Sequence, residues 1–505
     1  MEKKIPKRKD TSKKMLTKTN QADLPNAFDQ QKEHDQLNYI KEEIGALAKK
    51  LAANGKEVLA QKGFSKEQQD IFEEMFQKCF VSTADTTTKL LPNEETYVFT
   101  GDIEAMWLRD SSAQVVHYLP FAKTVPQIGR MIYGLIKRQM RYIGIDPYAN
   151  AFNEEANGHC WEKDDTDSND WEWERKYEID SLCYPLWLLH AYYEKTQDAR
   201  VFSAETKTAF RRILDTWKTE QRHDVDSSYY FRRVNCPPTD TLSNNGNGEP
   251  TAYTGMTWSG FRPSDDACRY GYLVPSNMFA SVVLGYLAEY ASSQYKDDAM
   301  AKEALDLKNQ IEDGIEAYAV RNVDGIGETY VYETDGYGHD VWMDDANVPN
   351  LLSMPWLGWC SPDDERYQNT RKWVLSSKNP FYYEGTAAKG IGSPHTPAGY
   401  IWHIALAMQG LTSADENEKT QLMKTLLTTD AGKRLMHEGF DSNDPEKFTR
   451  DWFAWANSLF ALYAMEYCEP RLLKTTRESP RKAQSPWGLA KDYGTGHERM
   501  FTKCI

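Results

Sequence analysis

The sequence predicts an all-α fold, in which a closed barrel of helical hairpins carries its functional site at one end. Three observations lead to this prediction. Apolar residues recur at helical spacing in many segments, these segments follow one another in pairs separated by loops with Gly, Pro or Asn, and the chemically unusual residues gather in alternate loops. With 505 residues, of which 40% are hydrophobic and 12% aromatic, the chain can bury one large core.

The chain divides into three parts by composition. Residues 1–35 are polar and lack apolar periodicity, so we expect a disordered or weakly ordered extension. Residues 36–467 are expected to form one domain, and residues 468–505 a tail of unknown role. Helices are predicted over Tyr39–Leu59, Phe64–Phe80, Ala113–Ala122, Ile128–Tyr142, Asp180–Lys195, Ala204–Arg222, Ser276–Tyr295, Ala299–Val320, Asn347–Leu357, Asp364–Ser376, Tyr400–Gln409, Glu418–Thr429 and Asp451–Tyr467.

Short extended pieces interrupt the helices. Tyr97–Ile103 is a run of β-branched and aromatic residues around a glycine, and residues 145–176 look irregular. Ser228–Val234 and Gly327–Glu333 cluster β-formers beside turn residues. We expect these last two segments to form hairpins across the mouth of the barrel and to line a pocket.

The stretch from Thr254 to Cys268 is the most unusual part of the sequence. It combines two glycines, large aromatics, Arg262 and the adjacent carboxylates Asp265 and Asp266. One interpretation is a capping run, with Ser264 as the N-cap of a helix that begins near Tyr270 and the carboxylates against its positive end. The other is a functional carboxyl whose pKa is raised by apolar surroundings, as a general acid requires.

Composition and charge exclude several classes of protein. A net charge of −15 and an isoelectric point near 5.3 argue against a nucleic-acid-binding surface, which needs clustered Lys and Arg. No apolar run approaches the length that crosses a bilayer. The basic start lacks an apolar segment typical of a secretory signal, and the eight cysteines lack the density of a disulfide scaffold. We therefore expect a cytoplasmic protein with no membrane or nucleic-acid partner.

Motifs for cofactor and metal chemistry are also missing. His395, His403 and His437 do not form a His-Glu-x-x-His pattern, and no paired Cys-x-x-Cys occurs. A P-loop, a dinucleotide fingerprint and a Gly-x-Ser-x-Gly elbow are absent. Paired carboxylates remain, and they match glycosidic-bond hydrolysis, in which one carboxyl protonates the leaving oxygen and another attacks or activates water. The sequence predicts no cofactor and no metal.

Three longer motifs resemble glycoside hydrolase family 125. They are Thr100-Gly-Asp-Ile-Glu-Ala-Met-Trp-Leu-Arg-Asp-Ser111, Thr257-Trp-Ser-Gly-Phe-Arg-Pro-Ser-Asp-Asp266 and His437-Glu-Gly-Phe440. The resemblance runs from about Phe64 to Glu466. It implies an (α/α)6 barrel and a metal-independent, inverting exo-α-1,6-mannosidase acting on mannose-containing oligosaccharides. Protein partners remain unknown.

The resemblance also implies roles for particular residues. The general acid falls on the pair Asp265 and Asp266 and the general base on Glu438. We choose Asp265 as the acid, because adjacent residues at a helix start point about 100° apart, which leaves Asp266 free to cap the helix or to hold Arg262.

The resemblance further implies a set of residues that bind the sugar: Arg109, Asp110, Trp107, Trp258, Arg262, Asp266 and His395. Arg109 and Asp110 look like the clamp on the terminal mannose, although a buried ion pair is the alternative. His395 is a weaker contact candidate. Trp107 and Trp258 line the pocket or belong to the core.

Two further functions stay open from the sequence. One is another inverting α-glycosidase, or a phosphorylase, on the same barrel. The other is a sugar-binding protein without catalysis, which the presence of both carboxylate positions disfavours.

Overall fold

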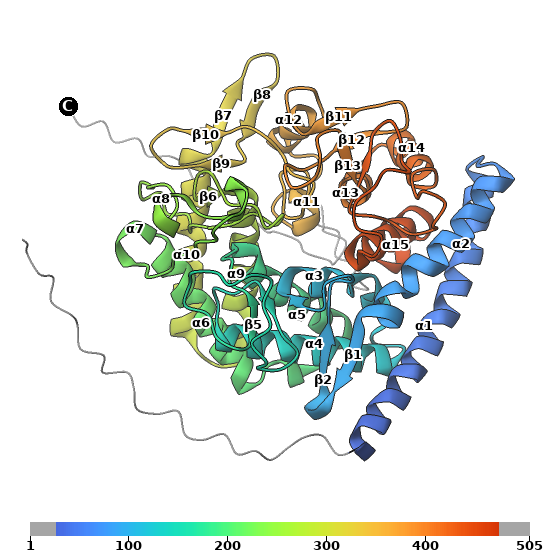
Figure 1. Ribbon diagram of the computed structural model, residues 1–505, viewed down its shortest axis with the longest axis horizontal. Coiled ribbons are helices and arrows are strands. Elements are labelled where there is room, and N and C mark those ends of the chain that lie inside the picture. Colours follow the sequence, from blue (N-terminus) through green and yellow to red (C-terminus); the bar gives the residue numbers. More distant parts are fainter. Residues whose placement is uncertain (1–26, 474–505) are drawn as a thin grey trace, which may run out of the picture.

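Helices dominate the computed structural model, which describes residues 27–473 (Figure 1). Local sequence explains their ends: Ser65 begins the second helix through a capping box, in which its Oγ accepts the Gln68 N–H at 3.2 Å and its N–H donates to Gln68 Oε1 at 3.0 Å. The helices are α1 (Ala27–Gln61), α2 (Lys66–Ser82), α3 (Leu108–Ala113), α4 (Pro126–Ile145), α5 (Ile179–Thr196), α6 (Ala204–Glu220), α7 (His223–Asp226), α8 (Ser243–Gly246), α9 (Val274–Ser293), α10 (Asp298–Tyr318), α11 (Met354–Leu357), α12 (Glu365–Val374), α13 (His403–Leu411), α14 (Glu416–Leu426) and α15 (Ala454–Cys468).

The strands are short and pair antiparallel in two- or three-stranded sheets. The pairs are β1 (Thr88–Leu91) with β2 (Glu95–Val98), β7 (Val320–Val323) with β8 (Gly327–Tyr330), β11 (Tyr382–Glu384) with β12 (Lys389–Ile391), and β13 (Tyr400–Trp402) with β14 (Gly439–Asp441); the triplets are β3 (Met106–Trp107), β4 (Ala151–Phe152) and β5 (Glu172–Glu174), and β6 (Tyr272–Leu273), β9 (Glu333–Thr334) and β10 (Asp340–Val341). Strands β3, β13 and β14 contain or adjoin residues of the pocket described below.

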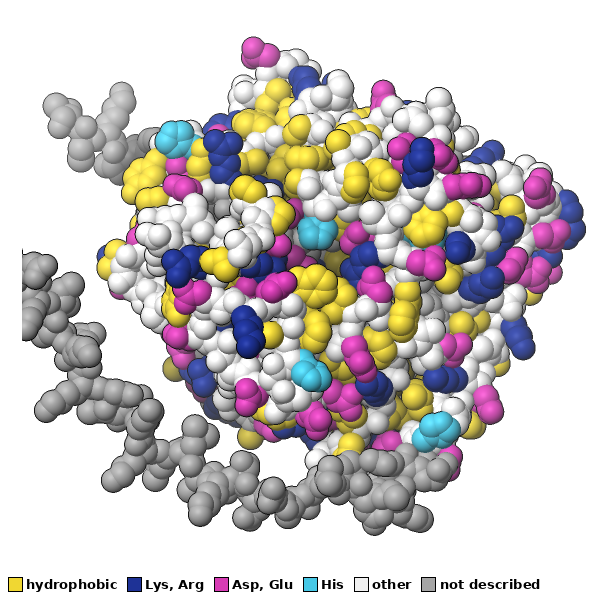
Figure 2. Space-filling view, in the orientation of Figure 1, with side chains coloured by type: hydrophobic (Ala, Val, Ile, Leu, Met, Phe, Trp, Pro, Cys, Tyr) yellow, Lys and Arg dark blue, Asp and Glu magenta, His cyan; other side chains and the backbone are white. Residues whose placement is uncertain are grey.

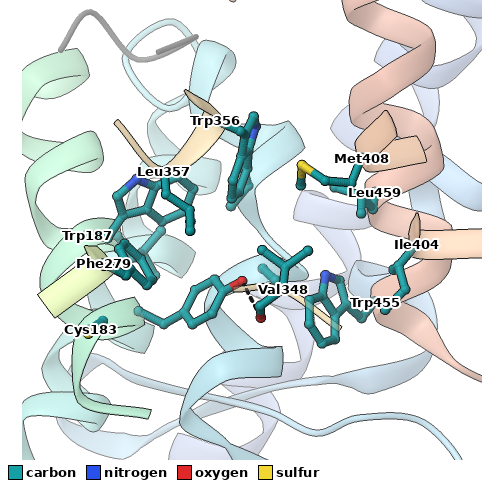
Figure 3. Close-up of a cluster of buried hydrophobic side chains, with 14 of the residues drawn as sticks. Cys183, Trp187, Phe279, Val348, Trp356, Leu357, Ile404, Met408, Trp455 and Leu459 are labelled. Carbon is teal, nitrogen blue, oxygen red and sulfur yellow. Dashed lines mark hydrogen bonds between the residues drawn. The ribbon is translucent and has the colours of Figure 1, made fainter. Parts of the chain in front are cut away.

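Alternate helices send side chains into one apolar centre. Figure 3 shows aromatic and aliphatic side chains from α5, α9, α11, α13 and α15 facing one another, among them Trp187, Phe279, Met408 and Trp455. Helices α9 and α15 are apolar on nearly every face and almost completely buried, whereas α10, α12 and α14 keep exposed polar faces. From α9 onward, the buried helices α9, α11, α13 and α15 thus alternate along the chain with the more exposed helices α10, α12 and α14.

Several elements differ from the sequence-based expectations. Helix α1 begins at Ala27, not near Tyr39, so part of the expected extension is helical; Glu33 is tied to Arg130 of α4 at 3.2 Å. The expected helix over 347–357 is reduced to α11, because the Asp344 carboxylate accepts the backbone N–H groups of Leu351 at 2.8 Å and Leu352 at 3.1 Å. These bonds depend on tertiary packing and leave no periodic signal.

The two expected hairpins have different outcomes. Residues 327–330 form β8, which pairs with β7, so this hairpin is confirmed. Residues 228–234 form no strand; Arg232 makes a single bridge with Asp165, with N–O distances of 2.8 and 3.1 Å. At the C-terminal end α15 runs to Cys468, a turn follows over Pro470–Leu472, and the rest of the expected tail lies outside the described residues.

Candidate active site

One pocket gathers loops that are far apart in the sequence. It draws on the segment around β3 and α3, the loop before α9, the loop before α11, and the β13, β14 and α15 region. Its lining consists of Thr100, Ile103, Trp107, Arg109, Asp110, Pro263, Ser264, Asp265, Asn347, His395, Trp402, Glu438, Arg450, Phe453 and Trp455. Figure 2 shows charged side chains of both signs and a histidine near the middle of this face of the molecule. Carboxylates, guanidinium groups and aromatic rings thus converge on one small space.

Asp265 occupies a tight turn and not a helix start. Its φ of 66° lies in the left-handed region, and α9 begins only at Val274, so the expected helix from Tyr270 with Ser264 as its cap is wrong. Lys176 Nζ donates to the Asp265 carbonyl at 2.8 Å and fixes the turn. This hydrogen bond helps to hold the strained backbone, and such strain is common at functional sites. The Asp265 side chain keeps 27% of its surface exposed.

Three donors surround the Asp265 carboxylate. Its Oδ1 accepts from Trp107 Nε1 at 3.3 Å, from Asn150 Nδ2 at 3.3 Å and from Arg109 Nη2 at 3.4 Å. These donors come from residues more than 100 positions away along the chain. Arg109 and Trp107, both expected to bind the sugar, thus contact the carboxyl of the expected general acid.

The charges around Asp265 decide its protonation. Burial acts to raise the pKa of Asp265, but the positive charges of Arg109 and Lys176 outweigh it and lower the pKa to about 2. The expectation that apolar surroundings raise this pKa is therefore wrong, because the neighbouring cations are invisible in the local sequence. Burial raises the pKa of Asp110 to about 6, against the opposing charge of Arg109.

Glu438 also lines the pocket and lies immediately before β14. Its backbone N–H donates to the Thr449 carbonyl at 3.3 Å, and Arg450 Nη1 lies 3.6 Å from its Oε1. The neighbouring His437 N–H donates to His403 Nδ1 at 3.0 Å, which anchors this loop to the start of α13. The Glu438 carboxyl is thus held by a rigid backbone and faces a cation.

His395 and Asp266 form a second charged pair. His395 Nδ1 lies 3.4 Å from Asp266 Oδ1, and Ser264 Oγ donates to Asp266 Oδ2 at 3.1 Å. Burial acts to lower the pKa of His395, but its hydrogen bond to Asp266 and the nearby carboxylates raise the pKa to about 9. Asp266 is buried and outside the pocket lining, so it supports His395, which reaches the pocket.

Besides Asp266, two more of the expected sugar-binding residues, Arg262 and Trp258, lie outside this lining. Arg262 is buried and its Nε donates to Glu333 Oε1 at 2.5 Å, so its side chain is held by Glu333 and not by Asp266. Trp258 is 1% exposed and stacks on His223 with ring centroids 3.6 Å apart. Of the two interpretations left open for Trp258, its placement favours the core.

Several pocket residues had no signal that singled them out in the sequence. Arg450 and Asn347 enter the lining from irregular segments, and Glu178 lies beneath it against Arg109. Arg450 has a φ of 50°, a backbone feature that the sequence does not reveal. Among the described residues no group of three or more His, Cys, Asp or Glu side chains is arranged to hold a metal ion. Within the same residues no helix is long and apolar enough to cross a membrane.

Comparison with known proteins agrees with this site. The family model described as metal-independent alpha-mannosidase (GH125) matches residues 69–465. The Meiotically up-regulated gene 157 protein of Schizosaccharomyces pombe is 38% identical over 424 residues, which cover 79% of this chain and 83% of that protein. A solved structure of a metal-independent alpha mannosidase from Streptococcus pneumoniae, a non-productive substrate complex with α-1,6-mannobiose, is 45% identical with a TM-score of 0.79, covering 82% of this chain and 97% of that one.

A helix-rich fold with this pocket and these relatives is that of a glycoside hydrolase. The chain belongs to the metal-independent α-mannosidase family, glycoside hydrolase family 125. The resemblance on the three sequence motifs is thereby confirmed.

Proposed function

We propose that this protein is an exo-acting, inverting α-mannosidase that releases terminal α-1,6-linked mannose from oligosaccharides, with Asp265 as general acid and Glu438 as general base. The observation that supports this most is the convergence of both carboxyl groups in one pocket from loops 173 positions apart (438 − 265). Inverting hydrolysis needs two such carboxyls with room for a water molecule between them and the sugar.

The proposed scaffold is an (α/α)6 barrel. Inner helices α3, α5, α9, α11, α13 and α15 would form the ring, and each follows an outer helix along the chain, α2, α4, α6, α10, α12 and α14 respectively. Contacts between α3 and α5, α5 and α9, α9 and α11, α13 and α15, and α15 and α3 support the ring. The apolar centre in Figure 3 fills its interior. The loops at one end then carry the pocket.

The substrate is proposed from the relative and from the pocket together. The Streptococcus pneumoniae protein, 45% identical, was solved in complex with α-1,6-mannobiose. In this chain Trp107, Trp402, Phe453 and Trp455 supply flat apolar faces in the pocket lining, and such faces pack against sugar rings. Asp110 and His395 supply hydrogen-bonding groups for sugar hydroxyls.

In the proposed reaction Glu438 accepts a proton from water as the water attacks the anomeric carbon. Asp265 donates a proton to the glycosidic oxygen, the C–O bond breaks, and β-mannose leaves with inverted configuration. Because the pKa of Asp265 is low, Asp265 is a carboxylate at rest, and the proton that it donates must come from a neighbouring carboxyl group.

The test is hydrolysis of α-1,6-mannobiose followed by NMR of the first-formed sugar, with and without phosphate. We expect β-mannose to appear first and phosphate to have no effect. Retained α-mannose would exclude inversion, a mannose 1-phosphate product would show a phosphorylase, and binding without turnover would show a sugar-binding protein. Mixed oligomers released from the interior of a mannan would exclude the exo mode of action.

A further inference from the structure

Three buried carboxyl groups, of Asp110, Glu178 and Asp180, and the partly exposed carboxyl of Asp265 surround the guanidinium of Arg109. Arg109 Nη1 donates to Glu178 Oε2 at 2.5 Å and to Asp180 Oδ2 at 3.0 Å, Nη2 contacts Asp265 Oδ1 at 3.4 Å, and Nε lies 3.5 Å from Asp110 Oδ2. The side chains of Glu178 and Asp180 have no exposed surface, and that of Arg109 is 2% exposed. This cluster couples the proposed general acid to residues that substrate does not reach.

Arg109 alone cannot neutralise these four carboxyl groups; from the edge of the cluster Arg450 also acts on Asp110, and Lys176 and His395 act on Asp265. Lys176 does not correct the imbalance, because its ammonium group already lies 2.8 Å from Asp240 and 3.7 Å from Glu174. An uncompensated carboxylate in a low-dielectric interior costs several kcal/mol, and such groups take up a proton instead. The cluster around Arg109 therefore retains at least one proton.

Glu178 is the carboxyl best placed to hold that proton. Its Oε2 accepts from Arg109 and from Ser181 Oγ at 2.7 Å, while Oε1 is buried without a hydrogen-bond donor among the described residues. Burial raises the pKa of Glu178 well above its usual value, against the charge of Arg109, and interaction with the Asp265 carboxyl raises it further. The other charged group that faces it is Asp180, in the first turn of α5, which begins immediately after Glu178.

We propose that Glu178 is a neutral carboxylic acid in the resting enzyme and supplies the proton that Asp265 delivers to the leaving oxygen. As the glycosidic bond breaks, the Glu178 proton passes to the Asp265 carboxylate and Asp265 delivers a proton to the leaving oxygen. Both Glu178 and Asp265 are then carboxylates beside Arg109. The proton that Glu438 takes from the attacking water is released to solvent and returns to buried Glu178 through the partly exposed Asp265, so no net proton is consumed. Glu178 is thus a positioning residue that acts through Asp265, and this inference rests on the proposed function.

The test compares two substrates that differ in their need for an acid. Hydrolysis of α-1,6-mannobiose requires protonation of a poor leaving group, whereas 2,4-dinitrophenyl α-mannoside releases a stable anion without protonation. We expect Glu178→Gln, which keeps the shape and a donor but carries no transferable proton, to lower kcat on mannobiose about 100-fold, as loss of general acid catalysis does. On the dinitrophenyl substrate the kcat of Glu178→Gln should remain within about threefold of the wild-type value. The mannobiose rate of the variant should recover toward acidic pH, where solvent protonates Asp265 directly.

Asp180→Asn is the matched control, because Asp180 also binds Arg109 from the same helix. If Asp180→Asn affects only the structure around Arg109, its kcat should fall equally on both substrates. Equal losses on both substrates for Glu178→Gln, or an unchanged pH profile, would overturn the proton-supply role. Asp265→Asn, measured alongside, keeps the two proposals distinct. If Asp265→Asn loses activity on mannobiose only, while Glu178→Gln loses activity on both substrates, only the proton-supply role of Glu178 fails. If Asp265→Asn loses activity on both substrates equally, the assignment of Asp265 as general acid fails. Circular dichroism and thermal unfolding establish that each variant is folded.

Discussion

Arg450 Nη1 lies 3.6 Å from Glu438 Oε1, while its Nε donates to Asp102 Oδ1 at 3.0 Å. Asp102 and Arg450 are 348 positions apart, so this contact joins the beginning of the domain to its end beside the proposed base. The Arg450 side chain also lies over the Phe453 ring, 4.4 Å from its centroid. Asp102 and Phe453 thus hold the guanidinium next to Glu438.

Replacing Arg450 is expected to impair catalysis more than binding. Arg450→Ala should lower kcat on α-1,6-mannobiose about 10- to 100-fold, because Glu438 loses the cation that orients it. Arg450→Lys should fall between this variant and wild type, since Lys keeps the charge but not the planar fork that engages Asp102. Steady-state kcat and KM measure the effect. Wild-type kcat in Arg450→Ala would show that Glu438 is oriented by its backbone alone.

Substitutions of the adjacent residues Asp265 and Asp266 should have different effects on turnover. Asp265→Asn should lower turnover of mannobiose by about 10²- to 10⁴-fold with little change in substrate binding, because proton donation is lost. Asp266→Asn should have a smaller effect, because Asp266 contacts His395 and not the pocket. Kinetics and isothermal titration with mannobiose measure both. An inactive Asp266→Asn beside an unimpaired Asp265→Asn would reverse the assignment.

Activity should not depend on an added metal ion. Purified enzyme treated with EDTA and desalted is expected to keep its full rate, since the proposed reaction uses carboxyl groups for both proton transfers. The control is the same enzyme returned to Mg²⁺, Ca²⁺ or Zn²⁺. A loss of turnover on EDTA treatment that one of these ions restores would contradict the mechanism.

The pair of His395 and Asp266 should give a pH-dependent contribution to stability. The folded-state pKa of His395, about 9, lies above the value of about 6.5 for an unfolded chain, so the contribution is full below pH 6.5 and is lost as pH rises toward 9. Wild type and His395→Gln should therefore differ in Tm at pH 6 and converge by about pH 9.5. Thermal unfolding across this range measures the difference. A gap in Tm that is constant with pH would show that the pKa of His395 is the same in the folded and unfolded chains, contrary to this prediction.

The apolar centre should dominate stability. Phe279 is completely buried and makes an edge-to-face contact with Tyr184, with ring centroids 5.2 Å apart. Phe279→Ala is expected to lower the free energy of unfolding by about 3–5 kcal/mol, because it removes a buried ring and leaves a cavity. The exposed Lys302→Ala is the control and should change it by less than about 0.5 kcal/mol. Denaturant unfolding followed by circular dichroism measures both, and similar values for the two would contradict the role of this centre.

Helices with strong periodicity or continuous apolar composition could be predicted from the sequence. The run that becomes α9 is one example, because its apolar residues leave it no stable position outside a core. The segment 347–357 could not be predicted, since its backbone N–H groups are taken by the Asp344 carboxylate instead of by a helix. Hydrophobic periodicity indicates which residues are buried. Hydrogen bonds from the backbone to a nearby side chain do not change that periodicity, so they cannot be predicted from it.

The sequence by itself determined the family, the chemical types in the site and the pairing of helices, because these depend on residues that are neighbours along the chain. Only the tertiary structure decided which charges act on Asp265. Arg109 is 156 positions away, yet its charge and that of Lys176 reverse the direction of the Asp265 pKa that its local surroundings predict. The physical reason is that Coulomb interactions depend on distance in space and on burial, and folding alone sets both.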